Sequence, residues 1–500
     1  MLLLGLDIGT SSIKASVVDA ETGRVVASAV FPEEEAAIIA PKPGWAEQDP
    51  LQWWADAKKA ILKCHASGSY DPKEIASIGI AYQMHGLMLV DKDQNILRNA
   101  IIWCDGRAVA TGEKAFAEMG EAYCLTNLLN APGNFTASKL AWVKENERDI
   151  YNRIDKLMLP GDFISMKLTG TITTSASALS EGIFWNFSNA GVDQNLMKYF
   201  GFDEKLIPNV QPVFSTHGEV SKTVADELSL RAGIPVAYKA GDQPNNAFAL
   251  QALEPGEVAA TAGTSGVIYG ISDQLTYDPQ SRINSFAHVN HTAEDPRIGV
   301  LLCINGAGIF NRWSRDVAGR QHSYDELNKI AAAIAPGSED LMALPFGNGP
   351  ERMLNNQTVG AHFHGIDLNL HTTAHFIRST QESIAFAFRY GLDIMRENGM
   401  HPSVIRAGRT NMFLSSVFTE AFVNATGVPV ELYSTDGSVG AALGGGVGAG
   451  IFKDAASAFG ETKPQQTVEP ENEGIYNELY FKWKKILDQH FNKKATAIAM

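Results

Sequence analysis

The sequence has few cysteines and no excess of positive charge. Its four cysteines are spread over 500 residues with no close-spaced pair, which excludes a disulfide framework and a Cys-based metal knuckle. Isolated thiols fit a reducing compartment. The formal net charge of −15 argues against a broad nucleic-acid-binding surface, which needs a positive field. Any anionic ligand must then be held locally, by backbone amides and a few Lys or Arg side chains.

Long apolar runs and a targeting segment are also absent. No uninterrupted apolar segment approaches the roughly 20 residues of a membrane span. The N-terminus runs directly into a pattern typical of a core strand, without a basic leader or a cleavage site. We therefore expect a cytoplasmic protein with no membrane partner. The hydrophobic content of 45% and the charged content of 19% are those of a globular protein, and 500 residues suit two to four domains.

Two stretches half a chain apart resemble each other. Residues 1–19 contain an apolar run, a Gly-Thr-Ser-Ser turn and a second apolar run, which is the pattern of a β-hairpin, and a third strand is expected at 25–30. Residues 260–273 repeat this pattern, which predicts a duplicated domain whose two hairpin turns face each other across a cleft. Turn amides and hydroxyls suit phosphate oxygens. The candidate phosphate-binding residues are Gly9, Thr10, Ser11, Gly263, Thr264 and Ser265.

The two hairpins differ two residues before the first glycine, where the first has Asp7 and the second has Thr261. A carboxylate beside a phosphate cradle is unfavourable unless a cation lies between them. Asp7 is therefore a candidate for holding Mg²⁺ through water, since Mg²⁺ keeps several waters and binds few carboxylates. The alternative is a buried Asp that bonds turn amides, and the residues alone do not decide between the two.

A further carboxylate, Asp242, follows the apolar run 234–238. The segment 240–247 reads Ala-Gly-Asp-Gln-Pro-Asn-Asn-Ala and is predicted to be too irregular for a helix or a strand. A lone Asp in a Gly-Asp turn is commonly an ordinary turn residue. Its position just before the second hairpin nevertheless makes Asp242 a candidate catalytic base.

Polar side chains also follow the apolar strand expected at 75–80. Ligands lie at the carboxyl ends of strands in α/β sheets, so Gln83, Met84 and His85 are placed to line a small polar pocket. The alternative for His85 is a residue that only caps the end of the strand.

The segment 101–107 has the same form. Asp105 and Arg107 could pair structurally while Trp103 packs in the core. Equally, the three side chains could form a sugar-binding wall, with the indole face against C–H groups and the charges bonding hydroxyls.

The C-terminal half offers a candidate nucleotide site. Residues 403–411 predict a strand, a small-residue turn and then a helix, which presents backbone amides to a nucleotide. Residues 436–446 begin a helix and have almost no side-chain bulk. Small side chains there suit close helix packing, close approach of a flat adenine, or both. A strand pair or a loop over the cleft is expected at 171–190. Further helices are expected at 50–66, 222–232, 372–398, 414–427 and 474–491.

Taken together, these stretches resemble the FGGY family of carbohydrate kinases, and the resemblance covers nearly the whole chain in order. It implies an α/β protein of the actin/hexokinase/Hsp70-type ATPase fold, with two duplicated ribonuclease H-like domains, 1–248 and 249–500, and a cleft between them. The motifs that carry it are Asp7-Ile8-Gly9-Thr10-Ser11, Trp45-Ala46-Glu47-Gln48-Asp49-Pro50, Gln83-Met84-His85-Gly86, Trp103-Cys104-Asp105-Gly106-Arg107, Gly241-Asp242-Gln243, Gly263-Thr264-Ser265-Gly266 and a C-terminal region from Ala361 to Glu382.

Within the family, the Gln-Met-His-Gly segment is similar to that of members that phosphorylate xylulose, whereas members that act on glycerol carry an Arg-Glu pair there. The resemblance implies transfer of the γ-phosphate of ATP to the terminal hydroxyl of D-xylulose, giving D-xylulose 5-phosphate. It implies Asp242 as the base and Asp7 beside Mg²⁺. The implied sugar contacts are Gln83, Met84, His85, Trp103, Asp105, Arg107 and Gln243, and the implied nucleotide contacts beyond the two turns are Gly408, Arg409 and Asn411.

Three positions depart from the family pattern. Pro244 follows Asp242-Gln243 where the xylulose-phosphorylating members often have Asp-Asn-Ala, the segment 406–410 replaces a triple-glycine turn, and Gln381 takes a position that is usually apolar. The alternatives are a kinase of another ketose, polyol or sugar acid (ribulose, fuculose or gluconate), or a nucleotide-gated binding protein or chaperone without sugar chemistry. A homodimer is left open.

Overall fold

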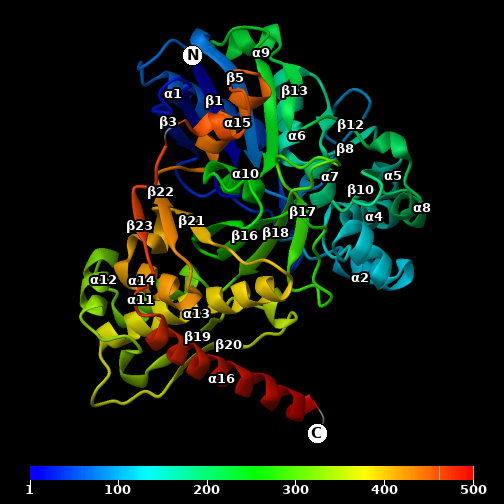
Figure 1. The fold of residues 1–500 in the computed structure, drawn as a ribbon. Coiled ribbons are helices and arrows are strands. Elements are labelled where there is room, and N and C mark those ends of the chain that lie inside the picture. Colours follow the sequence, from blue (N-terminus) through cyan, green and yellow to red (C-terminus); the bar gives the residue numbers. More distant parts are fainter. Residues whose placement is uncertain (461, 499–500) are drawn as a thin grey trace.

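Two mixed β-sheets form the frame of the computed structural model, which describes residues 1–460 and 462–498, with side chains to residue 491 (Figure 1). The first sheet has the order β13 (Phe214–Glu219), β14 (Pro235–Gly241), β5 (Ile75–Tyr82), β1 (Leu2–Ile8), β2 (Ile13–Asp19) and β3 (Val25–Phe31). The second has the order β17 (Asn284–Ala287), β18 (Ile298–Ile304), β16 (Gly266–Ser272), β15 (Glu257–Ala262), β21 (Val404–Gly408), β22 (Val430–Tyr433) and β23 (Gln466–Val468).

The two sheets share one topology. In the first, β1, β2 and β3 form an antiparallel meander, and β5 and β14 then run parallel to β1. In the second, β15, β16 and β18 form the meander, and β21 and β22 run parallel to β15. This repeat confirms the duplicated ribonuclease H-like arrangement that the two similar hairpins predict.

Helices cover both sheets. The start of α1 (Pro50–His65) follows the sequence signal, because the Asp49 side chain caps it by accepting from the backbone N–H of Leu51 at 2.9 Å and Pro50 occupies its first turn. A separate hairpin, β19 (Met342–Phe346) and β20 (Gly360–His364), lies in the second half. The other main helices are α2 (Val109–Met119), α4 (Thr136–Asn146), α6 (Pro160–Thr169), α7 (Ala176–Glu181), α8 (Gln194–Phe200), α9 (Lys222–Glu227), α10 (Asp242–Ala249), α11 (Gly308–Ala318), α12 (Tyr324–Ala332), α13 (Thr373–Glu397), α14 (Ser416–Thr426), α15 (Gly437–Gly448) and α16 (Glu473–Ile498).

Helix α15 belongs to the second half of the chain but lies against the first sheet, where Figure 1 shows it in orange against the blue strands. A Cβ at Gly5 would lie 1.8 Å from the carbonyl oxygen of Ser438, and a Cβ at Gly79 would lie 1.8 Å from that of Ala441. Backbone touches backbone on both sides of this contact. Close helix packing therefore explains the small residues of 436–446.

The sequence-based expectations are wrong for two segments. Most of the segment 240–247, predicted to be irregular, lies in α10. Gly241 is the N-cap of this helix, and Pro244 lies in its first turn, where a missing N–H breaks no helical bond. The segment 171–190, predicted as a strand pair or loop, does contain the short strands β9 (Thr173–Thr174) and β10 (Trp185–Asn186), the second paired with β11 (Gly191–Val192). Between them lies the unpredicted α7, which Ser175 caps by accepting from the backbone N–H of Ala178 at 3.1 Å.

One further helix is shorter than expected. Helix α9 ends at Glu227 rather than near residue 232. The backbone of Ser229 has a φ of 57°, which is left-handed and cannot continue a right-handed helix.

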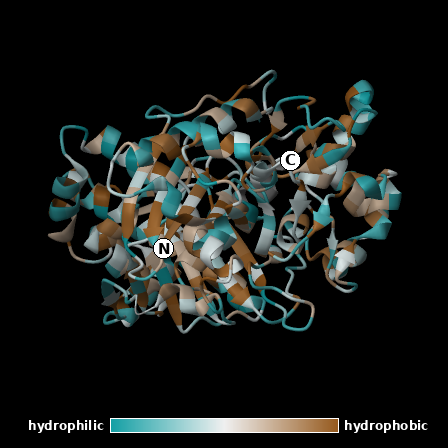
Figure 2. Ribbon diagram, turned by 90° about the horizontal axis from the view of Figure 1, so that it is seen from above, coloured by the Kyte–Doolittle hydropathy of each residue, from teal (hydrophilic) through white to brown (hydrophobic). Residues whose placement is uncertain are grey.

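The hydrophobic core follows the sheets, and Figure 2 shows hydrophobic residues mainly along the inner strands and hydrophilic ones mainly on loops and outer helix faces. A cluster of buried residues joins the two halves of the chain, with Leu3 and Tyr238 from the first sheet against Ala441 and Ala442 of α15. Among the helices that the structure describes, none has the length and apolarity to cross a membrane.

Candidate active site

Three predicted site residues follow neighbouring strands at the same level. Ile8, Tyr82 and Gly241 lie side by side across β1, β5 and β14, which run parallel. The next residue along each strand is Gly9, Gln83 or Asp242. The topology therefore gathers these segments at the carboxyl edge of the first sheet, where ligands bind in α/β folds.

Burial perturbs two carboxyl groups at this edge. Burial, with a smaller contribution from the charge of Asp7, raises the pKa of Asp242 to about 7. Burial and the charge of Asp436 raise the pKa of Asp7 to about 6, against a lowering by Lys14. A carboxyl group whose pKa lies near neutral pH is suited to general-base chemistry.

Asp436 is a carboxylate beside Asp7 that the sequence reasoning did not single out. It caps α15 by accepting from the backbone N–H groups of Ser438 at 3.0 Å and Val439 at 3.3 Å, and Lys14 Nζ donates to it at 2.7 Å. Burial alone would raise its pKa, but the hydrogen bonds from Lys14 and Ser438 outweigh burial and the pKa is lowered. The available signal was its place as an N-cap before the small-residue helix.

Gly437 makes room for Asp7. A Cβ at position 437 would lie 2.3 Å from Oδ2 of Asp7, so α15 can begin beside that carboxylate only with glycine there. Asp7 and Asp436 thus meet at the start of α15, and the charge of Asp7 also acts on Asp242. Oxygen ligands of this kind fit a hydrated, hard divalent cation.

His85 is partly buried and neutral. Its backbone is left-handed, with a φ of 61°, and its N–H donates to Oε2 of Glu181 at 3.1 Å. Burial and the nearby Lys139 charge lower the pKa of His85 to about 3. Nδ1 lies 3.0 Å from the carbonyl oxygen of Glu181, which can only accept, so Nδ1 carries the proton and Nε2 holds a lone pair for a hydroxyl donor.

Two further groups around His85 were missed by the sequence reasoning. Glu181, at the end of α7, is buried and accepts from the Tyr82 hydroxyl at 2.8 Å, and burial raises its pKa well above the usual value. Lys139 of α4 donates to the carbonyl oxygen of His85 at 2.7 Å, and burial lowers its pKa to about 7. In the sequence, each of these two residues is recognisable only as a single charged residue in a mainly apolar stretch.

Met84 and Glu181 border the residue before Asp242. A Cβ at Gly241 would lie 2.6 Å from Cγ of Met84 and 3.4 Å from Oε1 of Glu181. The structure therefore brings the Met84–His85 segment next to Asp242, as the sequence analysis expected of a substrate pocket.

The first hairpin turn is tied to the predicted sugar-binding residues. The Thr10 hydroxyl donates to Oε1 of Gln83 at 3.1 Å and accepts from Nε1 of Trp103 at 3.0 Å. The Trp103 side chain is 52% exposed, so it is not a core residue and its ring is available to a ligand. Gly9 and Ser11 lie in the same turn, where the Gly9 N–H donates to the Ser12 carbonyl at 3.1 Å.

Asp105 and Arg107 form a buried pair. Nε of Arg107 donates to Oδ1 of Asp105 at 2.9 Å, and Nη2 donates to Oδ2 at 2.7 Å. Nη2 also lies 2.7 Å from Oε1 of Glu47. The backbone N–H of Ala46 donates to Asp105, and the guanidinium lies 3.8 Å from the ring centroid of Trp45. Of the two interpretations that the sequence allowed, these contacts favour the structural pairing of Asp105 with Arg107 over direct contact with a sugar.

Two adjoining pockets lie on the other side of Asp242, one where the two halves meet and one within the second half. One, of about 340 Å³, brings together Gln243, the turn 263–265 and Asp436, with Gly408 and Asn411 on its wall. The other, of about 360 Å³, shares Gly263, Thr264 and Asn411 and extends over residues not predicted from the sequence. These are Gly308, Ile309 and Arg312 of α11, Tyr324, Asp325 and Asn328 of α12, and Gln381.

Two of the positions that depart from the family pattern, Gln381 and Arg409, have different surroundings. Gln381 lies on the wall of the second pocket and joins two neighbouring segments there, since it donates to Asn328 at 2.8 Å and accepts from the Ser415 hydroxyl at 2.7 Å. Arg409 is exposed and lines neither pocket, although its backbone N–H continues the strand pairing to Tyr433 at 2.8 Å.

Comparison with known proteins gives matches along the whole chain. The N-terminal domain of the FGGY family of carbohydrate kinases matches residues 2–249, and the C-terminal domain of that family matches residues 258–449. The chain is 29% identical over 508 residues to a xylulose kinase of Staphylococcus epidermidis, covering 99% of this chain and 98% of the relative. It is 27% identical over 477 residues to the xylulose kinase of Escherichia coli, covering 94% and 93%.

Solved structures show the same fold. A xyloylose (xylulose) kinase from Brucella ovis superimposes with a TM-score of 0.88 at 26% identity, covering 97% of this chain and 98% of that one. A gluconate kinase from Lactobacillus acidophilus has a TM-score of 0.86 at 20% identity, covering 98% of each chain, which shows the shared fold alone. Both domain models match in order and the relatives are enzymes, so the chain belongs to the FGGY family of carbohydrate kinases, which are ATP-dependent phosphotransferases.

Proposed function

We propose that this kinase transfers the γ-phosphoryl group of ATP to the terminal hydroxyl of D-xylulose, with Asp242 as the general base. The position of Asp242 carries the proposal. On one side, Gly241 borders Met84 and Glu181 of the polar pocket, and on the other side Gln243 lines the pocket between the halves. A base at this junction can take the proton of a hydroxyl that points from one pocket into the other.

The electrostatics of the polar pocket favour an uncharged sugar. Glu181 and Asp242 repel each other, and His85 is neutral. The carboxylate of gluconate would lie beside two carboxyl groups whose charged forms are already disfavoured. The hydroxyl groups of a ketose can instead pair with Gln83 and the lone pair on His85, and its C–H groups can lie against the exposed Trp103 ring. Among ketoses we choose xylulose because the relatives that match over nearly the whole chain are named xylulose kinases.

The residues of the second half fit a nucleotide. The turn 263–265 offers backbone amides and hydroxyls, and a Cβ at Gly308 would lie 2.2 Å from the Gly263 carbonyl oxygen, so α11 begins directly against this turn. We assign the phosphates to Gly263, Thr264 and Ser265, and the nucleoside to the pocket over α11. When bound, ATP supplies the phosphoryl group and Mg²⁺ offsets its charge. Asp7 is the residue that would hold the hydrated cation.

A panel of acceptors tests the substrate. Purified protein with ATP and Mg²⁺ is given D-xylulose, D-ribulose, fuculose, gluconate or glycerol, and ADP release is measured. We expect the highest kcat/KM with D-xylulose. A higher value with ribulose or gluconate would contradict the substrate assignment while leaving the kinase chemistry intact.

The variant Asp242→Asn tests the mechanism. General-base catalysis typically contributes 10²- to 10⁴-fold, so kcat should fall by roughly that factor while the KM for D-xylulose changes little. Asp273→Asn, at an exposed position, is the control, and thermal unfolding checks that both variants fold. If Asp242→Asn kept more than about a tenth of kcat, another group would have to accept the proton.

A further inference from the structure

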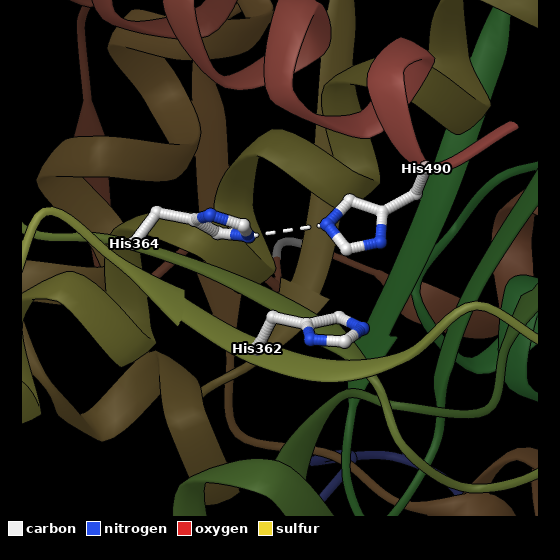
Figure 3. Close-up of side chains that lie close together, drawn as sticks. All are labelled: His362, His364 and His490. Carbon is white, nitrogen blue, oxygen red and sulfur yellow. Dashed lines mark hydrogen bonds between the residues drawn. The ribbon is translucent and has the colours of Figure 1, made fainter. Parts of the chain in front are cut away.

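Three histidines from two distant segments meet in the second half of the molecule (Figure 3). His362 and His364 lie on β20, two residues apart, so their side chains share one face of the strand. His490 reaches them from α16. Each offers a ring nitrogen, and these nitrogens all lie within 4.8 Å of one another. In the part of the chain that the structure describes, no other group of three His, Cys, Asp or Glu residues converges in this way.

The spacing of the rings is close to that of metal ligands. Nε2 of His490 lies 3.3 Å from Nε2 of His364, and the ring centroids of His362 and His490 are 4.2 Å apart. Ligand nitrogens at bonds of about 2.0–2.1 Å around a tetrahedral ion lie roughly 3.4 Å from each other. One edge of such a site is therefore already at ligand spacing, and the ring nitrogen of His362 lies within 4.8 Å of the other two.

The hydrogen bonding of His362 prepares it as a ligand. Its Nε2 lies 3.1 Å from the carbonyl oxygen of Val359, which can only accept, so Nε2 carries the proton and Nδ1 holds the lone pair. A carbonyl that accepts from the second ring nitrogen is the usual support of a metal-binding histidine. The contact between two Nε2 atoms requires one of them to donate, and a cation between them would replace this contact by two coordinate bonds.

Helix α16 is held in place independently of these rings. Trp483 is fully buried, and its Nε1 donates to the carbonyl oxygen of Ala343 on β19 at 2.8 Å. The three histidines are thus presented by elements that are already docked. Binding an ion there needs little reorganisation, and the protein is expected to fold without it.

We propose that His362, His364 and His490 bind one divalent transition-metal ion of the zinc type, with water in a fourth position, and that this ion fastens α16 to the β19–β20 hairpin. Imidazole nitrogens select Zn²⁺ and its transition-metal neighbours, whereas Mg²⁺ prefers oxygen. The site is therefore chemically separate from any cation at Asp7. Figure 1 places α16 at the end of the second half that faces away from the first sheet.

Titration of the full-length, tag-free protein with ZnCl₂ tests the proposal. After treatment with a chelator and its removal, calorimetry should give one Zn²⁺ per chain, and Tm should rise by roughly 2–3 °C at about 100-fold excess over Kd. Co²⁺ in place of Zn²⁺ should give the visible absorption of a tetrahedral nitrogen site.

Matched variants localise the ion. His362→Gln and His490→Gln should each weaken Zn²⁺ binding by roughly tenfold or more, because each removes one of three ligands. His401→Gln, at an exposed position away from the cluster, should bind as the unmodified protein does. Kinase activity with Mg²⁺ should be unchanged in His490→Gln.

Two outcomes would overturn the proposal. One is the absence of Zn²⁺ binding at about 100 μM metal. The other is binding that survives in both His362→Gln and His490→Gln, which would place the ion elsewhere, for instance at the exposed thiols of Cys104 and Cys303. Either result leaves the proposed kinase function untouched, since the test measures metal binding and not turnover.

Discussion

At the scale of single residues, the cleft holds carboxyl groups close to their neutral form. Burial raises the pKa of Asp7, Asp242 and Glu181. The charge of Asp436 raises the pKa of Asp7 further, and the charge of Asp7 raises that of Asp242. The folded protein therefore keeps protons at this edge that the unfolded chain would release. A cation or a substrate hydroxyl that binds here meets groups that are ready to exchange protons at neutral pH.

The pH dependence of the reaction follows from Asp242. Its pKa is raised to about 7, so below that pH the carboxyl group is protonated and cannot accept a proton. We expect kcat/KM for D-xylulose to rise with pH through about 7 and to level off above it. Asp7→Asn removes a negative neighbour and should move this midpoint to lower pH. A profile of kcat/KM at fixed ionic strength checks both, and a flat profile between about pH 6 and about pH 8 would contradict the assignment.

Sequence patterns predicted site residues that stand in turns after strands better than site residues that lie on helices. Asp7 and Asp242 stand beside glycine turns after apolar runs, so their exposure to a cleft could be predicted. Glu181 and Lys139 could not, because their position beside His85 depends on how α7 and α4 pack around the segment that follows β5. Asp105 and Arg107 had two interpretations, and only the packing around Trp45 distinguishes them.

At the scale of elements, alternation and turn chemistry predicted the hairpins of both sheets, since strand pairing between neighbours is encoded locally. Helix α10 was missed because Gly-Asp-Gln-Pro is also a typical turn sequence. The helix forms because its first turn needs no partner for Pro244 and because the buried Phe248 packs against Tyr238.

The contact between α15 and β5 gives a test at this scale. In Gly79→Ala the new Cβ would meet the Ala441 carbonyl at 1.8 Å, so α15 has to move away from the sheet. We expect the free energy of unfolding to fall by about 3 kcal/mol, near the upper range for overpacked sites. Chemical denaturation measures it.

Gly474→Ala is the matched control for this experiment. Nothing lies near a Cβ at position 474, and alanine favours a helix, so this variant should be neutral or slightly more stable. Equal unfolding midpoints for the two variants would mean that α15 does not touch the sheet as described.

At the scale of the whole molecule, the two halves are interlocked. Helix α10 leads from β14 of the first sheet to β15 of the second, and α15 returns from the second half to the first sheet. The buried cluster around Leu3, Tyr238 and Ala441 has members from both halves. The proposed domain boundary between residues 248 and 249 therefore divides the sequence, whereas the buried cluster includes residues from both sides of that boundary.

Interlocking predicts cooperative unfolding. Because the first sheet loses part of its cover when α15 leaves it, melting of one half should destabilise the other. Differential scanning calorimetry of the full chain should show one transition. Two well-separated transitions would show that the halves are independent. Residues 1–248 expressed alone should be poorly soluble, since they expose the surface on which α15 lies.

The position of α15 also constrains how this kinase can be recombined with its relatives. A chimera joined at the midpoint would lay a foreign helix on a native sheet, where glycines at 5 and 79 face backbone atoms of Ser438 and Ala441 at contact distance. Productive crossovers must inherit the sheet and the helix from one parent. Substitutions at these positions should therefore covary across the family, although the positions are more than 350 residues apart in the chain. The hydrogen bond from Ser77 to Gly445 joins the same two elements across a separation of 368 residues.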